Sequence, residues 1–293
     1  CIRDSICPHK KLQKMKTLIT IVCAFILASA TAQNFQGKAI YKTHRKMDLK
    51  LSGPNGSEMS DEKKAQMNAM LMKQFQKTFI LDFTKTESIY KEDKKLAPPS
   101  QPMQGMNIMI VGSGGGSDVL YKNTQDKSFM NKTEIMGKLF LISDKLPVYN
   151  WELSNETKNI GIYTCYKATY TREEERTTMD MVDGEVKEKK EKVTMVTTAW
   201  YAPQIPVSNG PDSYNGLPGL ILEINDGNLT VVCTEIILNP SEKVESSKPS
   251  KGKVVSQKKY EEIMAKKNKE MMEQFKSNRK NSKVRAMTIE IGG

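Results

Sequence analysis

Histidine is scarce in this 293-residue chain, which has only two. A Ser-His-Asp or Cys-His hydrolase needs an imidazole beside its nucleophile, and zinc sites favour several His or Cys ligands. One of the two histidines, His44, stands next to Arg45 and Lys46, a setting typical of an exposed position. The sequence therefore argues against a histidine-based hydrolase and against a His-rich zinc site.

The chain also lacks an apolar run long enough to stay in a bilayer. The run Leu18–Leu27 is shorter than the roughly 20 residues that a membrane-spanning helix needs. It follows a basic Met15–Thr17 and precedes Ala30–Ala32, an A-x-A cleavage site. The alternative is a buried N-terminal helix. We expect a cleavable signal peptide.

Three segments with different roles follow from this interpretation. Residues 1–14 are expected to be an upstream or fragment segment, residues 15–32 the signal peptide, and residues 33–293 a single exported domain. Its location would be periplasmic, outer-membrane-associated or extracellular, without a transmembrane segment.

The net charge of the whole chain is +11, and much of the excess lies between Lys243 and Arg285. A basic chain can bind nucleic acid, but an exported protein seldom meets it. We therefore expect no nucleic-acid partner. An anionic lipid or polysaccharide surface and a plain solvated face remain as the alternatives for this charge.

Cysteine is sparse as well. Of the five cysteines, only Cys165 and Cys233 lie beyond the expected signal peptide. Exported proteins meet an oxidising environment in which cysteines pair. A Cys165–Cys233 disulfide and two separately buried thiols are the two alternatives.

Alternating apolar and polar residues predict strands along most of the chain. The charge-dense segment Thr171–Lys192 is expected to form an exposed hairpin tip. The expected strands are Gly37–Leu51, Thr78–Lys85, Ser88–Tyr90, Val119–Lys122, Ser128–Lys132, Ile135–Ile142, Tyr149–Leu153, Ile162–Tyr170, Val193–Tyr201, Leu220–Ile224 and Leu229–Leu238.

Two segments have helical spacing instead. The first, Asp61–Gln76, is amphipathic, and the second, Ser256–Asn278, belongs to a basic C-terminal tail. Successive strands with one early and one late helix predict an α+β fold. We expect a curved antiparallel meander, which can curl into a half-barrel because strands twist.

Methionine is abundant, with 18 residues. On the early helix, Met67, Met70 and Phe75 share a face that could line an apolar groove against the curved sheet. Such a groove would hold an acyl chain or an apolar peptide, and the alternative is a fully packed core. A second set, Met103, Met106 and Met109, has the spacing of a Cu(I) site built from soft thioethers.

One short motif points to a family. The hexapeptide Gly216, Leu217, Pro218, Gly219, Leu220 and Ile221 is the string that names the GLPGLI family, and the segments Gly161–Ala168 and Ala199–Pro206 are also similar to that family. The resemblance implies an exported protein of a Gram-negative bacterium. It supplies no established activity, catalytic residue or cofactor.

The motif also has a physical interpretation. Gly216 and Gly219 allow backbone angles or close approaches that a side chain would forbid, and Pro218 suits the start of a strand. The motif can therefore be a shaped entry into a core strand or a turn that contacts a ligand.

The expected function is non-enzymatic. We expect an envelope protein that binds, carries or scaffolds, with an apolar ligand or an envelope component as partner and no cofactor. An envelope hydrolase that uses carboxylates and a Cu(I)-binding protein are the alternatives.

Overall fold

The structure is a computed structural model, and it describes residues 35–45, 60–62, 76–94, 109–110, 118–182, 185–245, 247–281 and 288–289. The chain divides into two compact units, Cys1–Phe35 and Gln36–Gly293, and every element named below belongs to the second. The expected signal peptide lies outside the described residues.

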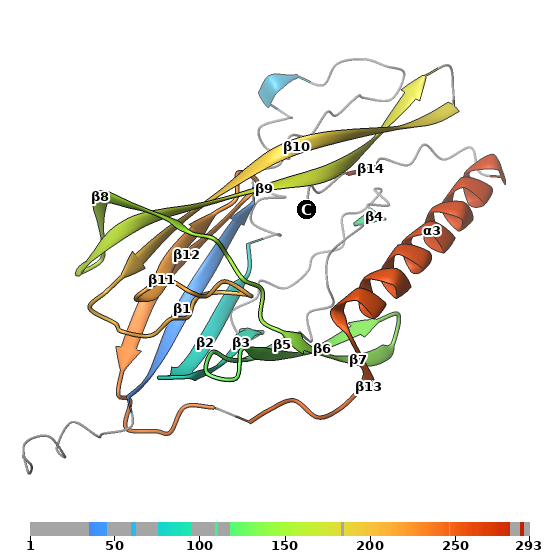
Figure 1. The fold of residues 1–293 in the computed structure, drawn as a ribbon. Helices are drawn as coiled ribbons and strands as arrows, with labels where there is room; N and C mark the ends of the chain where they lie inside the picture. Colours follow the sequence, from blue (N-terminus) through green and yellow to red (C-terminus); the bar gives the residue numbers. More distant parts are fainter. Residues whose placement is uncertain are drawn as a thin grey trace, which may run out of the picture. The chain divides into compact units, whose positions relative to one another are not determined.

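One twelve-stranded sheet dominates the second unit (Figure 1). Its order is β13-β7-β6-β5-β3-β2-β1-β12-β11-β10-β9-β8, and neighbours are antiparallel except β13 and β7. The strands are β1 (Gln36–Arg45), β2 (Thr78–Thr84), β3 (Glu87–Glu92), β5 (Val119–Asn123), β6 (Ser128–Ile135), β7 (Lys138–Lys145), β8 (Glu152–Ile160), β9 (Tyr163–Val182), β10 (Glu185–Ala202), β11 (Leu220–Asn225), β12 (Leu229–Leu238) and β13 (Lys253–Val255).

Three smaller elements complete the described part. A two-stranded sheet pairs β4 (Met109–Ile110) with β14 (Thr288–Ile289) in parallel. Helix α3 (Gln257–Asn281) begins where the sequence predicted, because the Oγ of Ser256 accepts a hydrogen bond from the backbone N–H of Lys259 at 3.2 Å. No described helix is long and apolar enough to cross a membrane.

The α+β class expected from the sequence is wrong, although the antiparallel sheet is confirmed. The described part is a β-rich fold in which α3 is the one substantial helix, and it meets the sheet mainly at β7. Of the expected early helix, Asp61 and Glu62 are helical and residues 63–75 lie outside the described residues, so no early amphipathic helix is seen. Among the described residues, irregular segments also cover strands of the sheet, in addition to the contact of α3 with β7.

The core lies on the face of the sheet that carries Ala39, Leu81 and Tyr90, here called the inner face. Strand register places these three side chains side by side, and all are buried. In the neighbouring row, the ring of Phe83 covers Gly37, where an added Cβ would lie 2.4 Å from the ring's Cζ. The alternation of the strands thus gives one apolar layer.

The connection between β10 and β11, residues 203–219, covers part of this face and is here called the inner segment. Its buried side chains Ile205, Val207 and Leu217 add to the core. At the start of β11, Ile221 donates its backbone N–H to the Asn209 carbonyl at 3.0 Å and accepts the Tyr41 hydroxyl at 2.8 Å. The segment is therefore held by both halves of the sheet.

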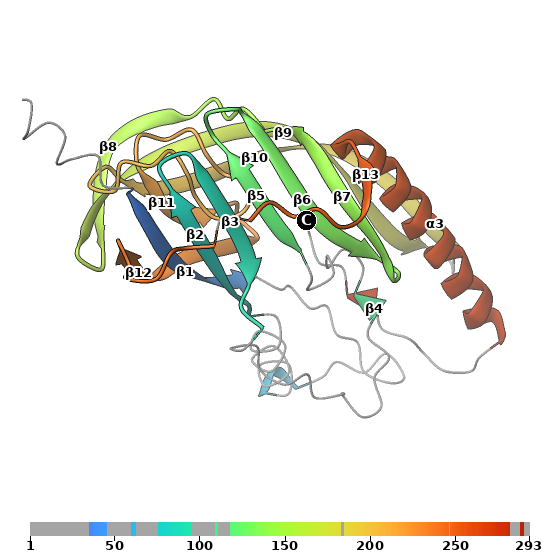
Figure 2. The same ribbon diagram turned by 90° about the horizontal axis from the view of Figure 1, so that it is seen from below.

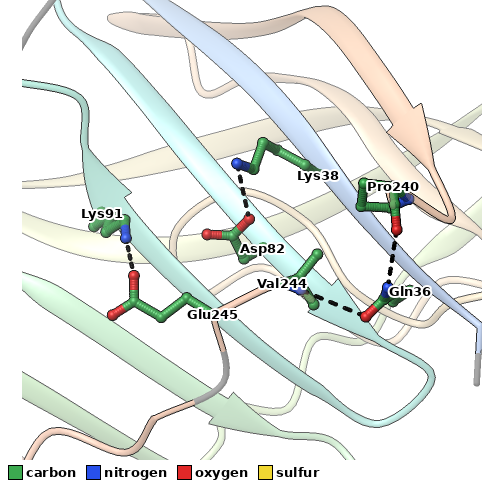
Figure 3. Close-up of polar contacts among 7 residues, drawn as sticks. All are labelled: Gln36, Lys38, Asp82, Lys91, Pro240, Val244 and Glu245. Carbon is green, nitrogen blue, oxygen red and sulfur yellow. Dashed lines mark hydrogen bonds and ion pairs between the residues drawn. The ribbon is translucent and has the colours of Figure 1, made fainter. Parts of the chain in front are cut away.

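The connection between β12 and β13 crosses the other face and is here called the outer strap. Val244 is buried there, and its N–H is 3.5 Å from Oε1 of Gln36. Glu245 pairs with Lys91, beside the ion pair between Lys38 and Asp82 (Figure 3). Further along, the ammonium of Lys248 lies 5.0 Å from the ring centroid of Tyr121. Figure 2 shows the strap passing over β2, β3 and β5.

Candidate binding site

The GLPGLI hexapeptide ends the inner segment and starts β11. Gly216 has a φ of 94°, a value that favours glycine. At Gly219 an added Cβ would lie 2.4 Å from the carbonyl oxygen of Ala202, so no side chain fits. Leu217, Leu220 and Ile221 are buried and Pro218 is exposed. This geometry agrees with a shaped entry into a core strand.

The residues just before the hexapeptide hold a second segment of the chain. The indole N–H of Trp151 donates to the Asn215 carbonyl at 2.9 Å, and a Cβ on Gly216 would meet that nitrogen at 3.7 Å. The hydroxyls of Tyr149 and Ser213 are 2.8 Å apart. The residues that lead into the motif therefore have a second role, because Ser213 and Asn215 fix the side chains of Tyr149 and Trp151.

Four aromatic side chains gather at this place and are here called the aromatic cluster: Tyr149, Trp151, Tyr170 and Tyr214. Ring centroids within the cluster lie between 5.2 and 6.3 Å apart, in tilted and edge-to-face arrangements. All four residues are only half-buried. Rings of this size usually lie in a core or at an interface, so four half-exposed rings in contact form a candidate recognition surface.

Lys122 of β5 anchors the inner segment beside the cluster. Its side chain is fully buried, and its ammonium donates to the carbonyls of Gly210, Asp212 and Tyr214 at 2.7, 2.5 and 3.2 Å. Burial lowers the pKa of Lys122 to about 7. An ammonium has three N–H donors, and here each has a backbone acceptor. Lys122 is thus a structural clamp.

Ser88 lies directly across from Lys122 on β3, a pairing that resembles a nucleophile and its base. The Ser88 hydroxyl has no hydrogen-bond partner, but the residue is 2% exposed and Lys122 is 0% exposed. Because the lysine's donors are occupied and both side chains are shielded from solvent, this pair does not form a nucleophilic centre.

Asp212 differs from its buried neighbours because its side chain is exposed. It adopts a φ of 50°, which aspartate tolerates better than most residues. Protein still surrounds much of the carboxylate, and this burial raises the pKa of Asp212, against the opposing charge of Lys122. The backbone carbonyl of Asp212 accepts a hydrogen bond from Lys122, and the next two residues, Ser213 and Tyr214, contact Tyr149 of the aromatic cluster.

Arg172 is the cation next to the cluster on β9. Its Nε donates to Glu174 at 2.5 Å and a terminal nitrogen donates to the Thr197 hydroxyl at 3.1 Å. Both contacts lie within the β9–β10 ribbon, whose strands pair from Glu185 to Tyr201. Arg172 also has a side-chain hydrogen bond with Tyr214, so the guanidinium is held by its own ribbon and by the aromatic cluster.

Most of the methionine sites predicted from the sequence lie outside the described residues. This holds for the groove residues Met67, Met70 and Phe75 and for Met103 and Met106. Met109 lies in β4, where its backbone is opposite Thr288. The apolar groove and the Cu(I) site stay predictions. Among the described residues, no group of three or more His, Cys, Asp or Glu side chains is placed to hold a metal ion.

Cys165 and Cys233 are both buried and both free thiols in the structure. They lie on β9 and β12, which are separated by two strands of the sheet. Burial raises the pKa of Cys165 to about 11 and that of Cys233 to about 12. The Cys165–Cys233 disulfide stays a prediction, with two buried thiols as its alternative.

The hexapeptide can be recognised in the sequence, but the buried Lys122 and the aromatic cluster cannot. Lys122 stands in the sequence as the end of a short strand, and nothing in its local pattern marks it as buried. The available signal was the aromatic residues near the motif: Trp151 stands two residues from Tyr149, and Tyr214 stands two before Gly216.

A comparison with protein families gives a match that overlaps this part of the chain. A family model described as "Protein of unknown function (Porph_ging)" matches residues 151–223, a range that contains the hexapeptide and three of the four clustered rings. No curated protein matches the chain.

Two solved structures of PNGF-II, in space groups C2 and P21, are similar to the chain. Each is 13% identical with a TM-score of 0.44, and the match covers 79% and 80% of this chain. The chain spans about a third of the length of these solved chains, 33% and 34% respectively.

Proposed function

We propose that this chain is an exported protein of the GLPGLI family that acts by binding, and that the aromatic cluster contacts an apolar part of its ligand. The observation that carries the proposal is the cluster itself: four half-exposed rings in contact, supplied by the residues just before the hexapeptide, by the residues just before β8 and by β9. Family membership rests on the hexapeptide and its neighbouring segments, and export rests on residues 15–32.

Preorganisation supports a role in binding. Trp151 is fixed by a hydrogen bond to a backbone carbonyl and Tyr149 by a bond to Ser213. Side chains that are already ordered lose little conformational entropy when a ligand arrives. Aromatic side chains also supply a large contact area with few rotatable bonds. These properties suit an envelope binding, carrier or scaffold protein.

The two tryptophans allow a direct test. Trp151 belongs to the aromatic cluster. Trp200 lies outside it, with the Lys158 ammonium 4.5 Å from its ring centroid. Strand alternation places Trp200 on the opposite face from Thr197 and Ala199. The variant Trp200→Phe therefore leaves Trp151 as the only tryptophan, and Trp151→Phe leaves Trp200 as a matched control.

Both variants would be titrated with laurate and with an acetylated, amidated trileucine peptide. We expect a saturable change of tryptophan emission in Trp200→Phe and none in Trp151→Phe. Emission that stays constant in both variants, or changes equally in both, would contradict binding at the aromatic cluster.

A further inference from the structure

Lys122 and Arg172, the two cations described beside the aromatic cluster, are both committed to partners inside the protein. Lys122 uses its three donors on the carbonyls of the inner segment. Arg172 is held by Glu174 and Thr197. Neither side chain is therefore available to a ligand without loss of its own hydrogen bonds.

Asp212 is exposed to solvent, by contrast, although its carboxylate also accepts the backbone N–H of Ser213 and lies near the charge of Lys122. The residue directly precedes Ser213, whose hydroxyl hydrogen-bonds Tyr149, and Tyr214, whose ring centroid lies 5.2 Å from that of Tyr149. The other nearby carboxylate, Asp226, is occupied because its Oδ1 accepts the N–H groups of Asn228 and Leu229 at 3.0 and 2.7 Å. Of these two described carboxylates, Asp212 is thus the exposed one beside the rings.

The protein itself shows what such a pair of groups can hold. On the other face, the Lys158 ammonium lies 4.5 Å from the Trp200 ring centroid and 2.7 Å from both carboxylate oxygens of Glu223. A cation over an aromatic face is stabilised by the ring quadrupole, and a carboxylate adds an ion pair. The aromatic cluster and Asp212 present the same two kinds of group, an aromatic ring and a carboxylate. The nearby Lys122 gives its three donors to backbone carbonyls.

We propose that the ligand of the aromatic cluster carries an ammonium or guanidinium group beside an apolar group, with the cation at Asp212 and the apolar part on the rings. This inference rests on the proposed function and names its ligand class. The local preference for a cation runs against the +11 net charge of the chain, so general electrostatic attraction does not account for it.

The test uses the Trp200→Phe protein and three peptides that differ at one position: acetyl-Leu-Lys-Leu-amide, the norleucine isostere and the glutamate analogue. We expect the lysine peptide to bind about tenfold tighter than the norleucine peptide, the low end of what a hydrogen bond to a charged group contributes. The glutamate peptide should bind most weakly. Spermidine, which lacks an apolar group, distinguishes a polyamine from a basic peptide as the source of the ammonium.

The informative variant is Asp212→Asn, because asparagine also tolerates the positive φ of this position. It should remove the preference for lysine over norleucine and leave the norleucine affinity unchanged. Glu173→Gln, an equal charge change at an exposed site on β9, is the control and should keep the preference. Melting curves verify that both variants fold. In the Trp200→Phe protein with Asp212 intact, added salt should weaken the binding of the lysine peptide and of neither other peptide.

The outcomes separate the two proposals. Equal affinity for lysine and norleucine peptides, or an unchanged preference in Asp212→Asn, would overturn the cationic ligand while binding at the cluster stands. If no peptide, laurate or spermidine changes the emission of Trp151, both proposals fail together.

Discussion

The ammonium of Lys122 lies 2.7 Å from the carbonyl oxygen of Gly210, a residue 88 positions further along the chain. This bond joins β5, in one half of the sheet, to the inner segment that leads into β11, in the other half. The same ammonium reaches Asp212 and Tyr214. The position of the candidate site therefore depends on one buried side chain.

Replacing Lys122 by methionine should destabilise the protein strongly. One buried and two part-buried carbonyls would lose their donor, and an unsatisfied buried polar group costs about 1–3 kcal/mol. We expect a loss of about 3–5 kcal/mol in the free energy of unfolding, measured by urea denaturation. The exposed Lys138→Met on β7 is the control and should change it by less than about 1 kcal/mol. Equal effects of the two substitutions would show that the clamp is unimportant.

Gly219→Ala should destabilise the protein by about 2–4 kcal/mol, because the new Cβ would meet backbone atoms of Ala202 and Pro203. Gly227→Ala is a fitting comparison. Its φ of 96° also disfavours alanine, but nothing lies within 4 Å of the added Cβ, so only backbone strain of about 1–2 kcal/mol is expected. Thermal unfolding of both variants measures the difference, and a Gly219→Ala protein as stable as Gly227→Ala would contradict the close approach.

Asp118 offers a test of pH dependence. Burial raises its pKa, while its hydrogen bond with Thr133 lowers it, and its Oδ1 has no partner. A carboxyl whose folded pKa is raised favours folding below its unfolded pKa of about 3.9, and this contribution is lost as pH rises through the folded pKa. Asp118→Asn should therefore stabilise the protein at pH 7 and have little effect at pH 3. Urea denaturation at both values measures this, with the exposed Glu134→Gln as control. A stabilisation that is the same at both pH values would refute the assignment.

The state of the two cysteines can be measured by thiol labelling. With pKa values of about 11 and 12, both thiols are almost fully protonated at pH 8, and both are buried. Since the thiolate is the reactive form, native protein should label slowly. Denatured, unreduced protein without the signal peptide should yield two thiols per chain. A yield of zero that rises to two after reduction would show a Cys165–Cys233 disulfide instead.

Export has a simple chemical signature. If residues 15–32 are a signal peptide, N-terminal sequencing of the protein from its own host should begin near Gln33, with or without cyclisation to pyroglutamate. A full-length cytoplasmic protein that keeps Leu18–Leu27 would exclude the proposal.

Much of the sheet could be predicted from the sequence because alternation reports which side chains face the core. The main error in placement was the expected strand Ile135–Ile142. The chain turns within it, with φ values of 48° at Met136 and 78° at Gly137. A hairpin of this type is signalled by Asn-Gly or Asp-Gly, and Met-Gly does not give that signal.

The fold class was wrong for a different reason. Helical periodicity identified α3, but periodicity does not reveal what covers a sheet. Here irregular segments bury Ile205 on the inner face and Val244 on the other. Their apolar residues have no regular spacing, so they were not distinguishable from exposed loops.

The candidate site was only partly predictable. The hexapeptide is local and could be recognised, whereas the aromatic cluster is made across long sequence separations. Trp151 and Asn215 are 64 residues apart, and their contact depends on how the inner segment lies against the sheet. No spacing rule within a single sequence reports such a contact.

The pairing of β1 with β12 also affects when the sheet can fold during synthesis of the chain. The strand Gln36–Arg45 is made early, but its partner Leu229–Leu238 is among the last strands to leave the ribosome. Until then, one edge of β1 exposes its N–H and C=O groups to any other strand it meets. Assembly of the whole sheet must wait for nearly the complete chain, and such non-local pairing makes folding slow. If the chain is exported as we propose, slow folding would keep it unfolded for longer and so help its passage through a secretion channel.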